Sequence, residues 1–250
     1  PGLAERDEQD WLWLPPDDPL LDDPQLERFT ATQLILERMR QAMMLSGPQF
    51  LGIQESKSIL SWLEHNQPEL VQELQRIMPL SRFSAVLQRL ASEGVPLRAV
   101  RLIVESLIEY GQHEREPEAL ADYARIALKA QIYHQYSEAD GLHAWLLSPQ
   151  SENILREALR QTQTGVFFAL DENHSAAFIS LLNQAFVLRA KRKSVMLVAQ
   201  DLRSPLRTLL LEEFNHVPVL SFAELGSTSK VKVLGRIDLG QEALMRGAAA

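Results

Sequence analysis

The positions of proline and glycine between residues 46 and 137 most constrain the fold, because they divide a helix-forming stretch into short segments. Neither residue is well tolerated inside a helix. Between them, apolar residues recur at the three- and four-residue spacing of helices that bury one face. This spacing predicts one helix over Gln54–His65, a second from Pro68 and a third that begins after Ser81 and ends before Gly94. A fourth follows the turn Glu93–Pro96 and ends at Gly111, and a fifth covers Pro117–Gln135. Residues 46–137 therefore form an all-helical unit.

The pattern changes after Gly141, where short apolar runs alternate with helical segments. The runs LHAWLL, SVMLVA, VPVLS and KVKVLGRI each predict a strand. Between them, Ser148-Pro149 predicts a helix that continues to about Thr162, and Asn173 is a candidate cap for a longer helix. Ser204-Pro205 predicts the start of another, and Ser221 with Glu224 matches a capping box for a further short helix. Strands alternating with helices are typical of an α/β layer.

We therefore expect an α+β protein of several subdomains. An all-helical subdomain occupies residues 46–141, and an α/β subdomain with a small sheet occupies residues 142–239. Residues 1–45 begin with an acidic, proline-rich segment, in which Trp11 and Trp13 alternate with leucine as in a short strand. They end with a helix over about Ala31–Met44, whose start carries the capping-box pair Thr30 and Gln33. Residues 240–250 are predicted to be a tail.

Composition excludes several classes of site. The chain has no cysteine, so it has neither a disulfide framework nor a thiolate metal site. Its net charge of −8 argues against a general nucleic-acid binder. No uninterrupted apolar run is long enough to cross a bilayer, so we expect this region to be soluble.

No motif points to catalysis, a cofactor or a metal. The six histidines form no metal-binding pair of known spacing. The segment Asp171–His174 is more typical of a helix-capping loop than of a ligand set. The segment Gly226–Lys230 lacks the spacing of a phosphate loop and predicts a turn. The basic run Arg189–Lys193 is typical of a helix end, where cations are favoured.

Two other functional classes stay open from the residues alone. One is a soluble α/β enzyme with a site near Asn173, His174 or Asp201. The other is a nucleic-acid adaptor that uses Arg189–Lys193. Neither has a recognised motif in its support, so the residues favour a binding or assembly protein without catalytic, cofactor-binding or metal-binding residues.

Several stretches resemble the large export-gate protein of type III secretion systems and its flagellar counterpart. The most specific is the block PELVQELQRIMPLSRFSAVLQRLASEGVPLRAVRLIVESL over Pro68–Leu107. Others are FLGIQESKSIL, ADYARIALKAQI, LREALRQTQTG, VPVLSFAEL and KVKVLGRIDL, in the same order along residues 50–239. The virulence branch is favoured over the flagellar one.

The resemblance implies a particular place in a larger protein. Members have an N-terminal membrane half and a cytoplasmic half of four subdomains, which assembles into a nine-membered ring. Residues 1–45 resemble the end of the first subdomain and a connector, residues 46–141 the third, and residues 142–239 the fourth. The second subdomain and the start of the first are missing from the match. The chaperone-docking site of the flagellar branch therefore cannot be transferred to this chain.

The implied activity is not enzymatic and needs no cofactor or nucleic acid. The ring lies at the cytoplasmic face of the bacterial inner membrane, which the protein reaches only through its membrane half. It forms a homo-oligomer, a nonamer in the full-length protein, and receives chaperone–effector complexes. It also contacts the stalk of the export ATPase and gatekeeper proteins.

One local feature suggests where such a ring could be held together. Arg98 and Arg101 fall at the start of a predicted helix, where a cation opposes the helix dipole at a cost of about 0.3–1 kcal/mol each. In a ring these arginines could meet acids of the next subunit. The alternative is a solvated face on which Arg101 pairs with Glu105. The expected interface residues are Arg82, Arg89, Glu93, Arg98, Arg101 and Glu105.

The same helices also predict a core. Two neighbouring antiparallel helices carry leucine and isoleucine at helical spacing on the faces that would meet. The residues expected to be buried are Leu87, Leu90, Leu102, Ile103 and Leu107.

Overall fold

The computed structural model describes residue 15 and residues 30–162, 165–186, 193–210, 214 and 217–240. Residues 1–46 and 47–250 form two separate compact units. The predicted Trp11–Trp13 strand, the run 189–192 and the tail after residue 240 lie outside the described residues.

The first unit contributes one described element, helix α1 (Ala31–Ser46). Its predicted capping box is confirmed, since the Thr30 amide donates to Gln33 Oε1 at 2.8 Å and the Gln33 amide to Thr30 Oγ1 at 3.2 Å. The helix leaves apolar side chains exposed along one stripe, namely Ile35, Leu36, Met39 and Met43.

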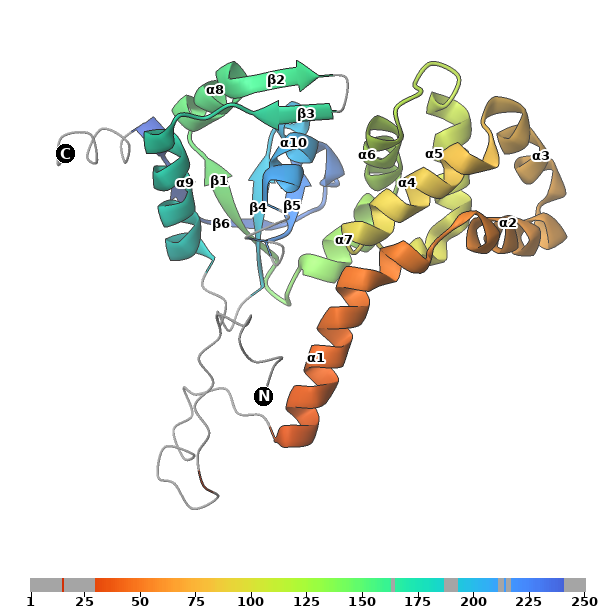
Figure 1. Ribbon diagram of the computed structural model, residues 1–250, viewed down its shortest axis with the longest axis horizontal. Helices are drawn as coiled ribbons and strands as arrows, with labels where there is room; N and C mark the ends of the chain where they lie inside the picture. The colour runs from red at the N-terminus through yellow and green to blue at the C-terminus, as the bar shows by residue number, and fades with distance from the viewer. Residues whose placement is uncertain are drawn as a thin grey trace. The chain divides into compact units, whose positions relative to one another are not determined.

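The second unit begins with the predicted run of helices (Figure 1). After the short turn η3 (Gly47–Phe50) come α2 (Ile53–Asn66), α3 (Pro68–Ile77), α4 (Leu80–Ser92), turn η4 (Leu97–Ala99), α5 (Val100–Tyr110), α6 (Pro117–Ala127) and α7 (Lys129–Tyr136). Prolines stand at the first position of α3 and α6, where their missing N–H costs nothing. The expected single helix from Pro117 to Gln135 is wrong, because the chain bends at Leu128.

The helices of residues 53–136, which we call the helical part, surround one apolar core. Leu87, Leu90, Ile103 and Leu107 are fully buried, as their helical spacing predicted. Leu102 is only partly buried, because it lies at the edge of the stripe on α5. The core prediction is thus confirmed for four of these residues.

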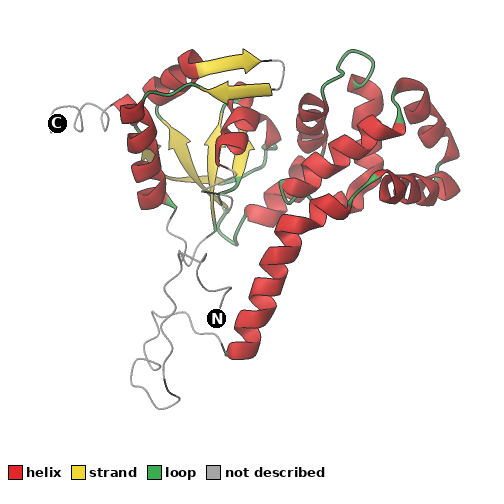
Figure 2. Ribbon diagram, in the orientation of Figure 1, coloured by secondary structure: helices red, strands yellow, loops and turns green. Residues whose placement is uncertain are grey.

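Residues 142–240, which we call the α/β part, contain a four-stranded parallel sheet (Figure 2). Its strands lie in the order β5 (Val219–Ser221), β4 (Ser194–Val198), β1 (Leu142–Leu147) and β6 (Val231–Ile237). All four match predicted strands. Together with the helical part they confirm the predicted α+β class.

The connections between these strands hold the main departures from the expected elements. Helix α8 (Pro149–Ala158) ends four residues before the expected Thr162. The chain then forms a hairpin of β2 (Leu159–Thr162) and β3 (Gly165–Phe168) that the sequence did not predict. Thr162, at the end of β2, is β-branched and has low helix propensity, which a strand accommodates better.

Two helix starts also differ from the expected ones. Asp171 rather than Asn173 caps α9 (Glu172–Ala185), since its carboxylate accepts from the His174 amide at 2.8 Å. Helix α10 (Gln200–Leu210) begins before Ser204 and contains Pro205. An internal proline costs about 3 kcal/mol. Burial of three leucines on α10 contributes roughly 1.5–3 kcal/mol each and outweighs that cost.

The sheet joins the two parts into one unit because both of its faces are buried. Along β4, Val195 and Leu197 join the core of the helical part, whereas Met196 and Val198 join a second core with α8, α9 and α10. Continuous burial is typical of parallel strands covered on both sides. The helical part thus covers one face of the sheet.

The turn before β1 depends on Gly141, which gives a first prediction. This glycine has a φ of +123°, and an added Cβ would lie 2.8 Å from the Lys230 carbonyl oxygen. We expect Gly141→Ala to lower the free energy of unfolding by about 1–3 kcal/mol. Urea denaturation measures this, with Gly47→Ala as the control because Gly47 has open space around it. Equal stability of the two variants would contradict the prediction.

Candidate functional site

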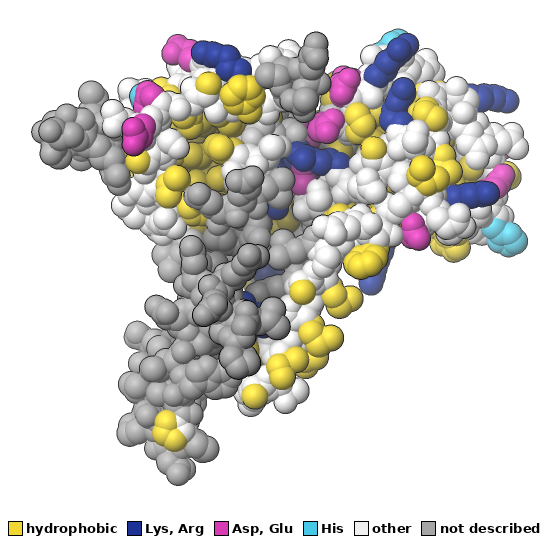
Figure 3. All heavy atoms as spheres, in the orientation of Figure 1, with side chains coloured by type: hydrophobic (Ala, Val, Ile, Leu, Met, Phe, Trp, Pro, Cys, Tyr) yellow, Lys and Arg dark blue, Asp and Glu magenta, His cyan; other side chains and the backbone are white. Residues whose placement is uncertain are grey.

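The six residues of the predicted interface fall on three consecutive elements but do not share one environment. Arg82 and Arg89 lie on α4, and Glu93 caps its C-terminal end. Arg98 lies in η4, so it precedes α5 rather than occupying its first turn as expected. Arg101 and Glu105 lie on α5. On the face drawn in Figure 3, basic side chains lie at several separate places over the helical part.

Arg98 and Arg101 are exposed, and Arg82 and Glu105 are partly exposed. Arg101 Nε lies 2.7 Å from Glu105 Oε1, an i,i+4 ion pair whose side chains are 63% and 39% exposed. The alternative pairing that the sequence left open is therefore present within one subunit. An exposed pair of this kind contributes only about 0.3–0.5 kcal/mol, so the two side chains can exchange partners at little cost.

The same pair borders a shallow depression of about 420 Å³ between α5 and the start of α3. Arg101 and Glu105 form one side. The other is formed by the α2–α3 junction, namely Asn66, Gln67, Pro68, Glu69 and Leu70. The depression thus presents both charge signs beside an apolar side chain.

Glu93 lies inside the protein and not on this edge. Its side chain is 3% exposed and contacts three arginines. Arg89 Nε lies 2.8 Å from Oε1, Arg125 Nη1 donates to Oε2 at 2.9 Å, and Arg203 Nη1 donates to the same oxygen. Arg89 itself is largely buried, and its guanidinium also reaches Ser204 at 3.2 Å.

Two further acids complete what we call the buried charge network. Arg125 Nη2 donates to Glu224 Oε2 at 2.7 Å, and Arg203 pairs with Asp122. Glu224 is held by the predicted capping box of turn η5 (Phe222–Glu224), in which Ser221 Oγ donates to its Oε1 at 3.2 Å. The network consists of Arg89, Glu93, Asp122, Arg125, Arg203 and Glu224.

The electrostatics follow from this balance of three arginines and three acids. Burial alone would raise the pKa of Glu93, but the charges of Arg203, Arg125 and Arg89 outweigh it and hold the pKa at about 2. The pKa of Asp122 is raised, mainly by burial. Glu93 is therefore ionised at neutral pH, and the network clamps α4 and α6 to α10 and η5.

Sequence reasoning identified only Arg89 and Glu93 of this network, and assigned them to a different role. The remaining members are separated by up to 110 residues from their partners, and each looks like an ordinary charged residue on its own helix. The packing of α6 beside α4 brings Asp122 and Arg125 to Glu93, and the pairing of the two parts adds Arg203 and Glu224.

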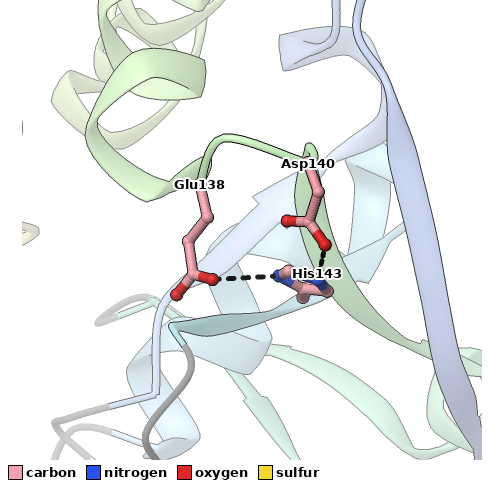
Figure 4. A group of neighbouring side chains, drawn as sticks. All are labelled: Glu138, Asp140 and His143. Carbon is pink, nitrogen blue, oxygen red and sulfur yellow. Dashed lines mark ion pairs between the residues drawn. The ribbon is translucent and has the colours of Figure 1, made fainter.

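A second group of titratable side chains lies where α7 leads into β1 (Figure 4). Glu138, Asp140 and His143 point toward one another, and one ligand atom from each lies within 4.8 Å of the others. The sequence predicted no metal-binding residues. This is the one group of three or more potential ligands among the residues that the structure describes.

The residues named for the alternative functions have structural roles. Asp171 caps α9, and its other carboxylate oxygen lies 2.6 Å from His174 Nδ1, as expected for a capping loop. Asp201 pairs with Arg156 at 2.7 Å between α10 and α8. Within the described part of the chain, no helix is both long and apolar enough to cross a membrane.

Known proteins share this sequence and fold. The FHIPEP family pattern matches residues 7–230. The hypersensitivity response secretion protein HrpI of Pseudomonas syringae pv. syringae is 59% identical over 239 residues, which are 96% of this chain and 34% of that protein. The chain thus spans about a third of the length of the curated relatives it matches.

Solved structures of other proteins have a similar fold. The cryo-EM structure of nonameric EPEC SctV-C matches with a TM-score of 0.75 and 33% identity, over 83% of this chain and 64% of that one. The complex of the Chlamydia pneumoniae CdsV and CdsO proteins matches with a TM-score of 0.76 and 30% identity, over 84% and 61% of the two chains. The chain therefore belongs to the FHIPEP family, as its resemblance predicted, and corresponds to the cytoplasmic region of the virulence-associated type III secretion export gate.

Proposed function

We propose that this chain is part of a ring-forming cytoplasmic platform, which docks chaperone–substrate complexes and partners of the export apparatus for translocation across the inner membrane. The observation that carries the proposal is the match to nonameric EPEC SctV-C over 83% of this chain. An equivalent assembly would place nine copies of the unit formed by residues 47–250 around an axis at the cytoplasmic face of that membrane.

The buried charge network supports this role through rigidity. A closed ring needs each subunit to present two different surfaces in a fixed relation, because the contact is heterologous. The network and the shared sheet hold the helical and α/β parts together as one block. In such a block, the helical part and the α/β part keep their relative position when a partner binds.

We propose that the subunit contact is an edge formed by four of the six predicted interface residues, namely Arg82, Arg98, Arg101 and Glu105. Glu93 and Arg89 support that edge from within instead of reaching across it, because they are committed to internal partners. The Arg101–Glu105 pair is weak in isolation and exposed, so it can re-pair with the opposite charges of an adjacent copy.

Partners other than self are proposed by analogy with relatives. The Chlamydia CdsV protein has been solved with CdsO, which is a second chain bound to a relative of this fold. We propose that the platform likewise contacts the stalk of the export ATPase, gatekeeper proteins and chaperone–effector complexes.

Reversal of Arg101 tests the proposed contact. In Arg101→Glu, a like-charge contact replaces an attraction across the interface, which can cost several kcal/mol once partly desolvated. We therefore expect ring formation by the full-length protein to weaken at least tenfold, measured by mass photometry, and secretion to fail. Within the subunit, the favourable helix dipole and the new repulsion from Glu105 are each below about 1 kcal/mol, so the melting temperature should hold.

Arg76→Glu is the matched control. Arg76 is an exposed helix arginine that pairs with Glu73 on α3, outside the proposed edge. We expect normal rings from it. Normal rings and normal secretion in Arg101→Glu would show that the edge is only a solvated face.

A further inference from the structure

We propose that Glu138, Asp140 and His143 form a binding site for one divalent transition-metal ion, with Zn²⁺ as the best fit to the ligands. The observation that points to a missing ligand is His143. Its side chain is 1% exposed, yet neither ring nitrogen has a hydrogen-bond partner. Buried polar atoms are nearly always satisfied, and a group left without a partner is costly.

The two carboxylates face different nitrogens of the ring, so an ion bound at Nε2 beside Asp140 requires the Glu138 side chain to turn toward that nitrogen. Asp140 Oδ2 is 3.4 Å from His143 Nε2, and Glu138 Oε2 is 3.9 Å from Nδ1 (Figure 4). Ligands at tetrahedral bond lengths of about 2.1 Å lie roughly 3.4 Å apart. The present separations of up to 4.8 Å therefore need a closure of about an ångström or more.

The two acidic side chains are partly exposed, whereas the histidine is fixed in the sheet. Asp140 is 42% exposed and Glu138 is 32% exposed, whereas His143 is anchored in β1 between β4 and β6. Glu138 and Gly141 exchange backbone hydrogen bonds of 3.0 and 3.1 Å across the turn. This turn returns both acids to the side of the ring.

Both carboxylates already accept a hydrogen bond from a nitrogen donor. Lys232 Nζ lies 2.6 Å from Asp140 Oδ2, and the Lys193 amide donates to Glu138 Oε1 at 2.9 Å. Lys232 is half-exposed and can withdraw, which leaves Asp140 for the metal.

The donor set selects the metal class. One imidazole nitrogen and two carboxylate oxygens suit Zn²⁺, with water as a fourth ligand, better than Ca²⁺ or Mg²⁺, which prefer all-oxygen sites. The ion would tie the end of the helical part to the first strand of the sheet. This inference is independent of the ring proposal, so either can fail alone.

Calorimetric titration of the EDTA-treated protein with ZnCl₂ tests the site. We expect one equivalent to bind, and Asp140→Asn and Glu138→Gln each to weaken binding at least tenfold. Both positions are partly exposed, so these variants should fold even where a change at the buried His143 does not. His134→Ala, an exposed histidine on α7, should bind like the parent protein.

Ring ¹⁵N NMR of His143 separates the metal from its competitor, a proton. Metal binding predicts a shift of one ring nitrogen that saturates at one equivalent of Zn²⁺. Two protonated nitrogens that do not respond to Zn²⁺ would mean a charged histidine between two acids, and the proposal would be wrong. Equal zinc binding by the parent and Asp140→Asn would also overturn it.

Discussion

Replacing Glu93 by glutamine is expected to lower the free energy of unfolding by about 3–5 kcal/mol. Glutamine keeps the shape but removes the charge, which leaves Arg125 and Arg203 buried without an equal number of acids. Removing one partner of a buried ion pair is far more costly than losing an exposed one. Urea denaturation monitored by circular dichroism measures the loss.

Glu64→Gln is the matched control, because Glu64 is exposed on α2. Its free energy of unfolding should change by less than about 0.5 kcal/mol. If Glu93→Gln were as stable as Glu64→Gln, the network would not clamp the two parts together.

The same residue gives the stability a defined pH dependence. Burial opposes ionisation of Glu93, but the arginines lower its pKa from 4.5 to about 2 in the folded protein. Its ionisation therefore stabilises the fold fully above about pH 4.5, and this contribution is lost as the pH falls through 2. The shift corresponds to about 3 kcal/mol. Glu93→Gln should lack this component, so the difference between the two proteins should shrink in acid.

Truncation of Leu107 is expected to have the second largest effect. Its side chain is fully buried in the helical core, so Leu107→Ala removes apolar contact and leaves a cavity. Such changes cost about 2–5 kcal/mol. The midpoint of thermal unfolding should fall by several degrees or more, as measured by differential scanning calorimetry.

Leu209→Ala is the control that separates the effect of burial on stability from the effect of helix propensity. Leu209 is 39% exposed on α10, and alanine is the better helix former at both sites. We expect a change below about 1 kcal/mol. A similar loss in both variants would contradict the assigned core.

The accuracy of the sequence-based prediction follows the range of the interactions that set each element. Prolines at helix starts, the capping pairs Thr30–Gln33 and Ser221–Glu224, and the leucine spacing of α4 and α5 act within a few residues. They were confirmed. The hairpin of β2 and β3 and the start of α10 at Gln200 were missed, because pairing and burial against distant residues outweighed the local preferences.

For the candidate sites too, local interactions could be predicted from the sequence and long-range ones could not. The i,i+4 pair of Arg101 and Glu105 could be foreseen, since four residues make one helical turn. The metal-ligand group lies within six residues, but its signal is the lack of hydrogen-bond partners on a buried ring, which no sequence displays.

By itself the sequence determined the approximate positions of most helices and of the four strands, the α+β class and the family, because periodicity, caps and a specific block of residues are local information. Only the tertiary structure decided that Glu93 is an internal anchor and not part of an exposed edge. The physical reason is that burial and charge pairing depend on which distant surfaces meet. Arg125 reaches Glu93 because α6 packs beside α4, and Arg203 reaches it from α10 because the α/β part packs against the helices.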